Sequence, residues 1–236
     1  MDAEVKDKLS AVSVATLTTV LFKRGLRNQV IQNVHPLRRR GCNMVGPAFT
    51  LRTIPAREDL NGIEVFRNPE HPQRKAIEVC PAGAVMVIDS RKDARAASAG
   101  DILVTRLQMR GVAGVVTDGG FRDAYAIAEL EMPSYHMRPA SPTNLTVHQP
   151  IEFETPIACG DAPVFPGDIM VGDDDSVIAI PKDIATAVAD EAFEMTVYED
   201  FVIERVRAGA TTVGLYPPTK QENLDAFADW RKQKGR

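Results

Sequence analysis

The stretch that decides the fold runs from residue 84 to residue 120 and reads AVMVIDSRKDARAASAGDILVTRLQMRGVAGVVTDGG. Its apolar runs at 84–89 and 112–117 are typical of short buried strands. Residues 101–110, which lie between these runs, are predicted to form a helix. Strand, helix and strand in this order predict a βαβ unit whose two strands are parallel.

Helices and strands are also expected on both sides of this unit. They are a helix over 4–24 that ends at Gly25, a strand over 44–54, a hairpin over 166–181 with an acidic turn at 173–175, a long helix over 182–207 and a short helix over 221–230. Prolines, glycines and charges over 55–72 predict a loop with at most a short helix. No repeat or interdomain linker divides the sequence, so we expect one α/β domain over residues 1–236.

Charge and hydropathy exclude several classes of protein. The net charge of the 236 residues is −4, so no overall positive field would attract nucleic acid, and no nucleic-acid partner is expected. No apolar run approaches the ~20 residues that a membrane span needs. The N-terminus MDAEVKDKLS lacks the basic start and apolar core of a signal peptide. We therefore expect a cytoplasmic protein with no membrane partner.

Cysteines and histidines show no metal-binding or disulfide pattern. Cys42, Cys80 and Cys159 are odd in number and far apart, which fits neither a disulfide framework nor a CxxC site. The four histidines lack HxxxH or HExxH spacing, so a zinc site is not expected. The sequence also has no phosphate-binding GxxxxGK[ST] loop, no GxGxxG and no GxSxG nucleophile elbow.

The first candidate site is the start of the predicted helix at Gly100-Asp101-Ile102-Leu103. The first N–H groups of a helix lack partners within it and carry the positive end of the helix dipole. They suit a carboxylate or phosphate, and Gly100 lets such a ligand approach closely. The alternative is that Asp101 is only the N-cap of the helix.

The second candidate site is Asp118-Gly119-Gly120-Phe121-Arg122-Asp123, directly after the second strand of the unit. Ligands of parallel α/β units bind beyond the carboxyl ends of the strands. Arg122 can hold a carboxylate with two hydrogen bonds, and Asp123 offers the oxygen ligand that Mg²⁺ prefers. The alternative is a surface turn in which Arg122 and Asp123 pair with each other.

Together the two sites favour chemistry that passes through an enolate. A helix N-terminus and an arginine would hold one carboxylate, while a cation at Asp123 would polarise the adjacent carbonyl. A Schiff-base lysine requires a desolvating pocket that lowers its pKa, and no lysine lies within an apolar strand. A metal-dependent route is therefore preferred.

Three segments carry a resemblance to a known family. AGDILVTRLQMRGVAGVVTDGGFRDAYAI at 99–127, VGPAFTLR at 45–52 and PGDIMVGDDDSVIAIP at 166–181 resemble the 4-hydroxy-4-methyl-2-oxoglutarate aldolase family, which is related to the regulator of ribonuclease E activity. The resemblance implies a single-domain β/β/α sandwich, similar to swivelling domains, with a central βαβ unit. It also implies a homotrimer or homohexamer with sites between subunits.

The resemblance implies a lyase that acts on a small 2-oxo acid. Such an enzyme cleaves a C–C bond of a 4-hydroxy-2-oxo acid to release pyruvate, and often also decarboxylates oxaloacetate. By this likeness Asp123 binds Mg²⁺ or Mn²⁺, and Arg122 contacts the substrate oxygens. The segment from Gly100 to Leu103 holds the carboxylate through the amides of Ile102 and Leu103, and Asp101 orders the metal's waters for proton transfer.

The likeness also places a glutamate of the neighbouring subunit's C-terminal helix near these waters. Glu199 is the candidate, and the same predicted helix carries Glu191, Glu194 and Glu204.

The competing hypothesis is a non-catalytic regulator that binds a ribonuclease. In non-enzymatic relatives no acid follows the arginine, so Asp123 favours the enzyme. The distal end of the substrate stays open: Arg52, Arg57 and Arg91 are candidates to bind a second carboxylate, with a surface role as the alternative for each. The loop over 55–75 and the tail beyond Leu215 look longer than in the best-known aldolases, which indicates that the substrate can differ.

Overall fold

A mixed sheet of eight strands forms the centre of the computed structural model, which describes residues 1–41 and 43–236. Cys42 lies outside the described residues, so the structure does not test the expectation that it belongs to no disulfide framework or CxxC site. Seven of the strands follow the order β1-β7-β5-β3-β2-β12-β13, and β9 also pairs with β2. Their bounds are β1 His35–Pro36, β2 Met44–Pro55, β3 Val85–Asp89, β5 Gly114–Thr117, β7 Ser134–His136, β9 His148–Phe153, β12 Ile169–Gly172 and β13 Val177–Ile180.

The predicted βαβ unit is confirmed. β3 and β5 are parallel, with Val85 opposite Gly114 and Ile88 opposite Thr117. Helix α4, Asp101–Met109, connects them. A small parallel sheet, β4 Ala97–Ala99, β6 Gly120–Phe121 and β8 Arg138–Pro139, lies beside the unit. Because β4 leads directly into α4, and β6 comes directly before Arg122, this small sheet brings the two candidate sites together.

Strand β2 joins the two halves of the main sheet. Its first residues, Met44–Pro47, pair with β12, and its last residues, Leu51–Pro55, pair with β9. Its other edge pairs in parallel with β3 through Ala48–Arg52. The register with β9 shifts between Arg52 and Thr53, which is the kind of bulge that bends a strand.

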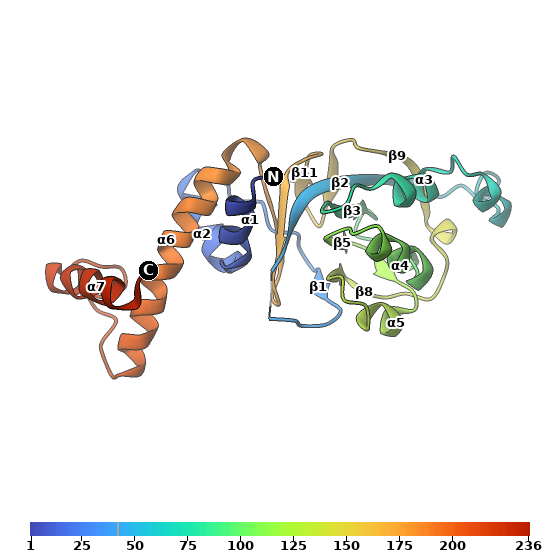
Figure 1. The fold of residues 1–236 in the computed structure, drawn as a ribbon. Coiled ribbons are helices and arrows are strands. Elements are labelled where there is room, and N and C mark those ends of the chain that lie inside the picture. The colour runs from blue at the N-terminus through green and yellow to red at the C-terminus, as the bar shows by residue number, and fades with distance from the viewer. Residues whose placement is uncertain (42) are drawn as a thin grey trace.

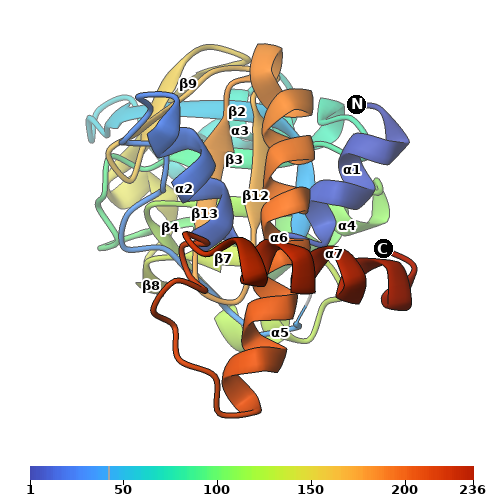
Figure 2. The same cartoon turned by 90° about the vertical axis from the view of Figure 1, so that its left-hand side faces the viewer.

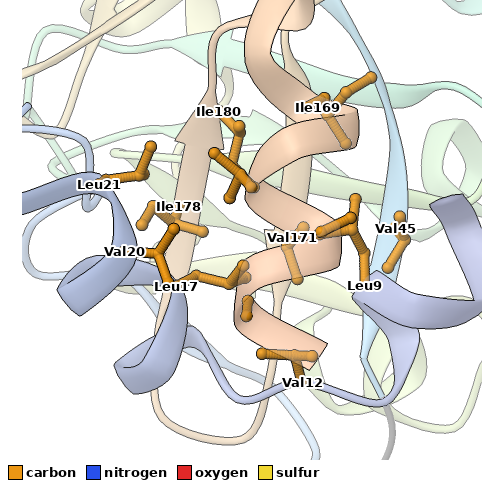
Figure 3. Packing of buried hydrophobic residues seen from close by; sticks show 14 of the residues in the cluster. Leu9, Val12, Leu17, Val20, Leu21, Val45, Ile169, Val171, Ile178 and Ile180 are labelled. Atoms are coloured by element: carbon orange, nitrogen blue, oxygen red, sulfur yellow. The ribbon is translucent and has the colours of Figure 1, made fainter. Parts of the chain in front are cut away.

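Helices cover both faces of the sheet (Figure 1). On one side lie α1 Ala3–Ser10, α2 Val14–Lys23 and α6 Ala185–Arg207; on the other lie α3 Pro72–Val79, α4 and α5 Ala124–Ala128. Figure 2 shows α6 lying over β12 and β13, flanked by α1 and α2. Apolar side chains pack between these elements, and Leu9, Leu17 and Ile178 among them are fully buried (Figure 3).

The α/β fold class with helices on a central sheet is thus confirmed, but the predicted helix over 4–24 is wrong. It is two helices, because Ser13 adopts an extended conformation and its hydroxyl accepts a hydrogen bond from Thr16 N–H. Such a serine is a typical N-cap. Gly25 ends α2 with a φ of +81°, as predicted.

Most other predicted elements agree with the structure. The hairpin is β12–β13, the long helix is η3 Lys182–Ile184 continued by α6, and the last helix is α7 Gln221–Lys234. The 55–72 loop contains the short 3-10 helix η1, Ile63–Arg67. Elements not predicted individually are the helices α3 and α5, the 3-10 helix η2 Asn144–Thr146, the strands β1, β4 and β6–β9, and the hairpin β10 Ile157–Cys159 with β11 Ala162–Val164. No helix of the described chain is long and apolar enough to cross a membrane.

The C-terminal arm, residues 198–234, extends away from the sheet (Figure 1). α7 packs across the second half of α6 (Figure 2) through an apolar cluster of its own. The aromatic rings of Tyr198, Phe201, Phe227 and Trp230 are in mutual contact there. The arm thus carries a second, smaller core that is separate from the three clusters around the sheet.

Candidate active site

A cavity of about 600 Å³ opens where α4 begins and β6 ends. Its first half is formed by Gly100–Leu103, Arg122 and Asp123, together with Ala97 and Ala99 of β4. Its second half comes from Ile63 and Phe66 of η1, Gln73 and Arg74 of α3, and Thr143 and Asn144. The residues predicted to bind the metal and the pyruvyl end of the substrate, Gly100–Leu103, Arg122 and Asp123, therefore line one cavity.

Gly100 is the point at which the two predicted sites meet. A Cβ atom at this position would lie 2.9 Å from Arg122 Cγ and 3.1 Å from Asp123 Oδ2. A side chain there would therefore displace the arginine or the aspartate. The backbone N–H of Arg122 also donates to the carbonyl of Ala99 at 3.1 Å, which fixes the distance between the segments.

The start of α4 is available to a ligand. Gly100, not Asp101, is the N-cap, and it has no side chain that could bond to the first turn. The alternative in which Asp101 caps the helix is therefore wrong. Asp101 Oδ1 instead accepts a hydrogen bond from the neighbouring Ile102 N–H at 2.8 Å. First-turn amides have no carbonyl partner within their helix, so the amides of Asp101 and Leu103 can bind an anion, and the amide of Ile102 can do so when the Asp101 carboxylate releases it.

Arg122 and Asp123 form an exposed ion pair, with 3.3 Å between Nε and Oδ2. Asp123 has a left-handed backbone with a φ of +55°, a conformation that aspartate tolerates better than most residues but that is still costly. It lies immediately before α5 and directs its carboxylate to the space beside Gly100. The pairing of Arg122 with Asp123 that was expected for a surface turn is therefore present, and both residues line the cavity.

A buried polar network supports the segment that carries these two residues. Asp118 is fully buried and accepts hydrogen bonds from the N–H groups of Ser90, Lys92 and Gly160. Burial raises the pKa of Asp118 above its ordinary value, and these hydrogen bonds oppose that rise. Gly119 fits closely against Ser90, since a Cβ atom there would lie 2.6 Å from Ser90 Cβ. Asp118 and Gly119 therefore hold the chain in place and are not themselves exposed to a ligand.

Glu199 lies outside this cavity within the subunit. It is on α6, and its carboxylate accepts hydrogen bonds from the hydroxyls of Thr16 at 2.9 Å and Tyr216 at 3.0 Å. Any part it takes in catalysis must therefore be in the cavity of another subunit.

The arginines suggested for a second carboxylate do not line the cavity. Arg52 pairs with Glu152 and Arg57 with Asp59, while Arg91 donates to the carbonyl of Val147. Arg74, which the sequence did not single out, lines it instead. In the sequence, Arg74 belongs to the RNPEHPQRK segment at the end of the predicted loop, and no motif marks it as a ligand-binding residue.

The ligands at this site fit a hard divalent cation. Asp101 and Asp123 line the same cavity, and both provide oxygen. Within residues 1–41 and 43–236, no group of three or more His, Cys, Asp or Glu side chains is arranged to hold a metal. Mg²⁺ commonly takes only one or two protein carboxylates and fills its remaining positions with water or substrate oxygens. The side chains present therefore match Mg²⁺ or Mn²⁺ better than zinc.

A family model described as RraA-like, Aldolase/RraA, matches residues 3–179. The chain belongs to the RraA-like family. This family includes both aldolases and inhibitors of ribonuclease E, and the resemblance predicted from the three segments is confirmed. Family membership therefore does not decide between catalysis and ribonuclease binding. Only the geometry of the site can favour one of them.

Individual relatives fall on both sides of that choice. The chain is 36% identical over 111 residues to a Halalkalibacterium halodurans protein named "Putative 4-hydroxy-4-methyl-2-oxoglutarate aldolase". This match covers 46% of this chain and 51% of that protein. Crystalline RraAS2 of Streptomyces coelicolor, described as an unusual member of the RNase ES inhibitor RraA family, is 30% identical. The RraAS2 match has a TM-score of 0.75 and covers 85% of this chain and 96% of RraAS2.

An uncharacterised Pseudomonas syringae protein shares the fold, with a TM-score of 0.76 at 22% identity, covering 92% and 98% of the two chains. Matches to the curated relatives span about half of their length or less, for example 27% of the Legionella pneumophila protein DlpA.

Proposed function

We propose that this RraA-like protein is a divalent-metal-dependent lyase that cleaves a C–C bond of a 4-hydroxy-2-oxo acid and releases pyruvate. One observation carries the proposal: a side chain at Gly100 would collide with Arg122 and Asp123. Three groups suited to a 2-oxo acid therefore surround one space: the first-turn amides of α4, a guanidinium and a carboxylate.

Each group has a distinct part in the proposed reaction. The amides of Ile102 and Leu103 bind the carboxylate of the substrate, since the helix N-terminus carries a partial positive charge and this carboxylate can replace Asp101 Oδ1 as the acceptor of the Ile102 N–H. Arg122 donates to the 2-oxo oxygen and stabilises the negative charge that develops there when the C–C bond breaks. Asp101, one residue before these amides, is placed to move the proton of the 4-hydroxyl through water.

Asp123 would hold Mg²⁺ or Mn²⁺ in this cavity, and Asp101 would contact the water molecules of the metal. When bound, the cation would act as a Lewis acid toward the 2-oxo group. Oxaloacetate has the same pyruvyl end, and its loss of CO₂ leaves the same negative charge, so we propose oxaloacetate decarboxylation as a second activity of the site.

Pyruvate release tests the proposal. Purified protein with Mg²⁺ or Mn²⁺ is incubated with 4-hydroxy-4-methyl-2-oxoglutarate or with oxaloacetate, and pyruvate is measured with lactate dehydrogenase. We expect release that EDTA abolishes and that Asp123→Ala lowers at least a hundredfold. Asp59→Ala is the matched control, because Asp59 is also an exposed partner of an arginine but lies outside the cavity. Equal rates for the two variants would contradict the proposal.

The similarity to RraAS2 supports ribonuclease binding as the second candidate function. A masking surface has no need of Asp123 or of a metal. If the protein inhibits a ribonuclease E-type enzyme and the inhibition survives both Asp123→Ala and EDTA, while no pyruvate forms, the regulatory function replaces the lyase.

We further propose a homotrimer or homohexamer in which Glu199 of one subunit approaches the cavity of the next. Exposed large apolar side chains of α4 and α5 support assembly: Ile102, Met109 and Tyr125 are 78%, 71% and 84% exposed in the single chain. Light scattering gives the subunit number. Glu199→Gln should lower kcat without changing that number, whereas an unchanged kcat would remove Glu199 from the proposed site.

A further inference from the structure

The second half of the cavity contains a guanidinium without an anionic partner. Arg74 is half-buried and lines the cavity, and it forms no ion pair with any carboxylate of the described chain. Its Nε atom is buried and has no hydrogen-bond partner. A partly desolvated arginine is stabilised by an anion that it can bind with two hydrogen bonds.

Phe66 holds Arg74 in position. The guanidinium carbon lies 4.6 Å from the centre of the Phe66 ring, which is a cation–π contact. His71 packs edge-on against the same ring, with 5.4 Å between the ring centres. The contact with the ring therefore limits where the guanidinium can lie in the cavity.

A second unpartnered donor lies in the same half of the cavity. Asn144 is only 5% exposed, and its Oδ1 accepts a hydrogen bond from the Thr143 hydroxyl at 3.3 Å. Its Nδ2 has no hydrogen-bond partner. A buried amide donor left unpaired costs free energy, and an acceptor atom of a ligand would remove that cost.

Both donors are fixed relative to the first half of the cavity, which contains Gly100, Arg122 and Asp123. Gln73, the residue before Arg74, donates from Nε2 to the carbonyl of Ser98 at 2.6 Å. Ala97 N–H donates to the carbonyl of Pro142, just before the Thr143–Asn144 segment. Both bonds end on β4, the strand that leads to Gly100. One ligand can therefore contact the two halves of the cavity together.

We infer that Arg74, with Asn144, is the specificity-determining residue of this site and binds a second carboxylate at the far end of the substrate. The inference rests on the proposed lyase function and assigns recognition of the substrate's second carboxylate to two residues of this chain. Ile63 and Phe66 give the same half an apolar wall, which suits the carbon chain next to that carboxylate.

Binding of two matched ligands tests the inference without turnover. 2-Oxoglutarate and 2-oxopentanoate have the same five-carbon chain and differ only in a terminal carboxylate or methyl group, and neither has a 4-hydroxyl that can be cleaved. In calorimetric titrations of the Mg²⁺-loaded protein, we expect 2-oxoglutarate to bind roughly tenfold or more tightly than 2-oxopentanoate, as charged hydrogen bonds imply.

Substitutions assign that preference to Arg74. Arg74→Gln should bring the ratio of the two dissociation constants close to one by weakening 2-oxoglutarate alone. Arg74→Lys should keep part of the ratio, because the charge remains and the planar fork is lost. Arg57→Gln, which removes an arginine outside the cavity, should keep all of it. Equal binding of the two ligands by the unmodified protein, or an equal loss of both in Arg74→Gln, would overturn the inference.

Turnover separates this inference from the proposed function. 4-Hydroxy-2-oxoglutarate and 4-hydroxy-2-oxopentanoate both yield pyruvate on cleavage and differ in the same terminal group. We expect Arg74→Gln to raise KM for the first and to leave KM for the second within about twofold. If neither compound is cleaved while the titrations still show the Arg74-dependent preference, the lyase proposal fails and the dicarboxylate site stands.

Discussion

Gly100 illustrates how one missing side chain makes room for several functional groups. Its φ of −118° and ψ of 179° are extended values that any residue adopts. The glycine is therefore required by the nearby Arg122 and Asp123 and not by its own backbone conformation.

We predict that Gly100→Ala lowers pyruvate release at least tenfold with little change in the free energy of unfolding. The added Cβ atom displaces Arg122 or Asp123, and small misplacements of catalytic groups have large effects on rate. The coupled lactate dehydrogenase assay measures pyruvate release, and urea unfolding measures the free energy of unfolding. Gly62→Ala is the control, since the atoms its Cβ would meet belong only to the flexible carboxylate of Glu64. An active Gly100→Ala protein would contradict the geometry.

His136 makes stability depend on pH. Burial, and secondarily the nearby His35, lower the pKa of His136 from 6.5 to about 4. Between these values the unfolded chain binds a proton that the folded protein does not, so the free energy of unfolding contributed by this group falls as the pH drops. We predict that His136→Phe, which keeps a ring against Phe121, loses less stability than the unmodified protein between pH 7 and pH 4.5. Parallel curves in urea titrations would refute this.

The break between α1 and α2 shows at the scale of elements why one sequence prediction was wrong. Apolar residues continue at near-helical spacing through Val12, and neither glycine nor proline separates the two helices. The break is stabilised from far away, because Asp173 Oδ2 in the β12–β13 turn accepts a hydrogen bond from Val14 N–H at 2.8 Å. Periodicity within a segment contains no information about such a partner.

The N-cap of α2 gives a prediction of moderate size. Ser13→Ala removes the acceptor of the Thr16 N–H and should cost about 1 kcal/mol of stability, as is usual for this substitution at an N-cap. The midpoint of urea unfolding measures it. Ser10→Ala should have a much smaller effect, because the Ser10 hydroxyl bonds only to the exposed carbonyl of Lys6 within α1.

The same contrast applies to the candidate site. The first half of the cavity, with Gly100–Leu103, Arg122 and Asp123, was predictable because β4–α4 and β6–α5 begin within 25 residues of each other. Each of these pairs comes soon after a strand of the βαβ unit. The second half of the cavity was not predictable, because α3 and the Thr143–Asn144 segment reach the cavity only through tertiary contacts with β4. Arg74 has no periodic or motif signal, whereas the three arginines suggested from the sequence bind groups outside the cavity.

At the scale of the whole molecule, the chain divides into a body around the sheet and the C-terminal arm. The arm contains Trp230, the single tryptophan of the protein. Its indole N–H donates to Glu204 of α6 at 3.0 Å, and its ring contacts Phe201 and Phe227. Tryptophan fluorescence therefore reports on the arm alone.

We predict that the arm unfolds before the body. Its core is small, so fluorescence should change at a lower urea concentration than far-ultraviolet circular dichroism, which follows the whole chain. Phe201→Ala should move the fluorescence transition to lower urea and leave the main dichroism transition nearly in place. Coincident transitions in both proteins would show instead that the arm and the body unfold as one unit.

The pairing of β2 has a consequence for synthesis on the ribosome. Met44–Pro47 pair with Ile169–Gly172, which are translated more than 120 residues later. Until they emerge, the growing chain presents an apolar, unpaired strand edge, and such edges associate with other chains. Nascent chains that stop before residue 169 should therefore depend on chaperones, and that dependence should end soon after β12 leaves the exit tunnel.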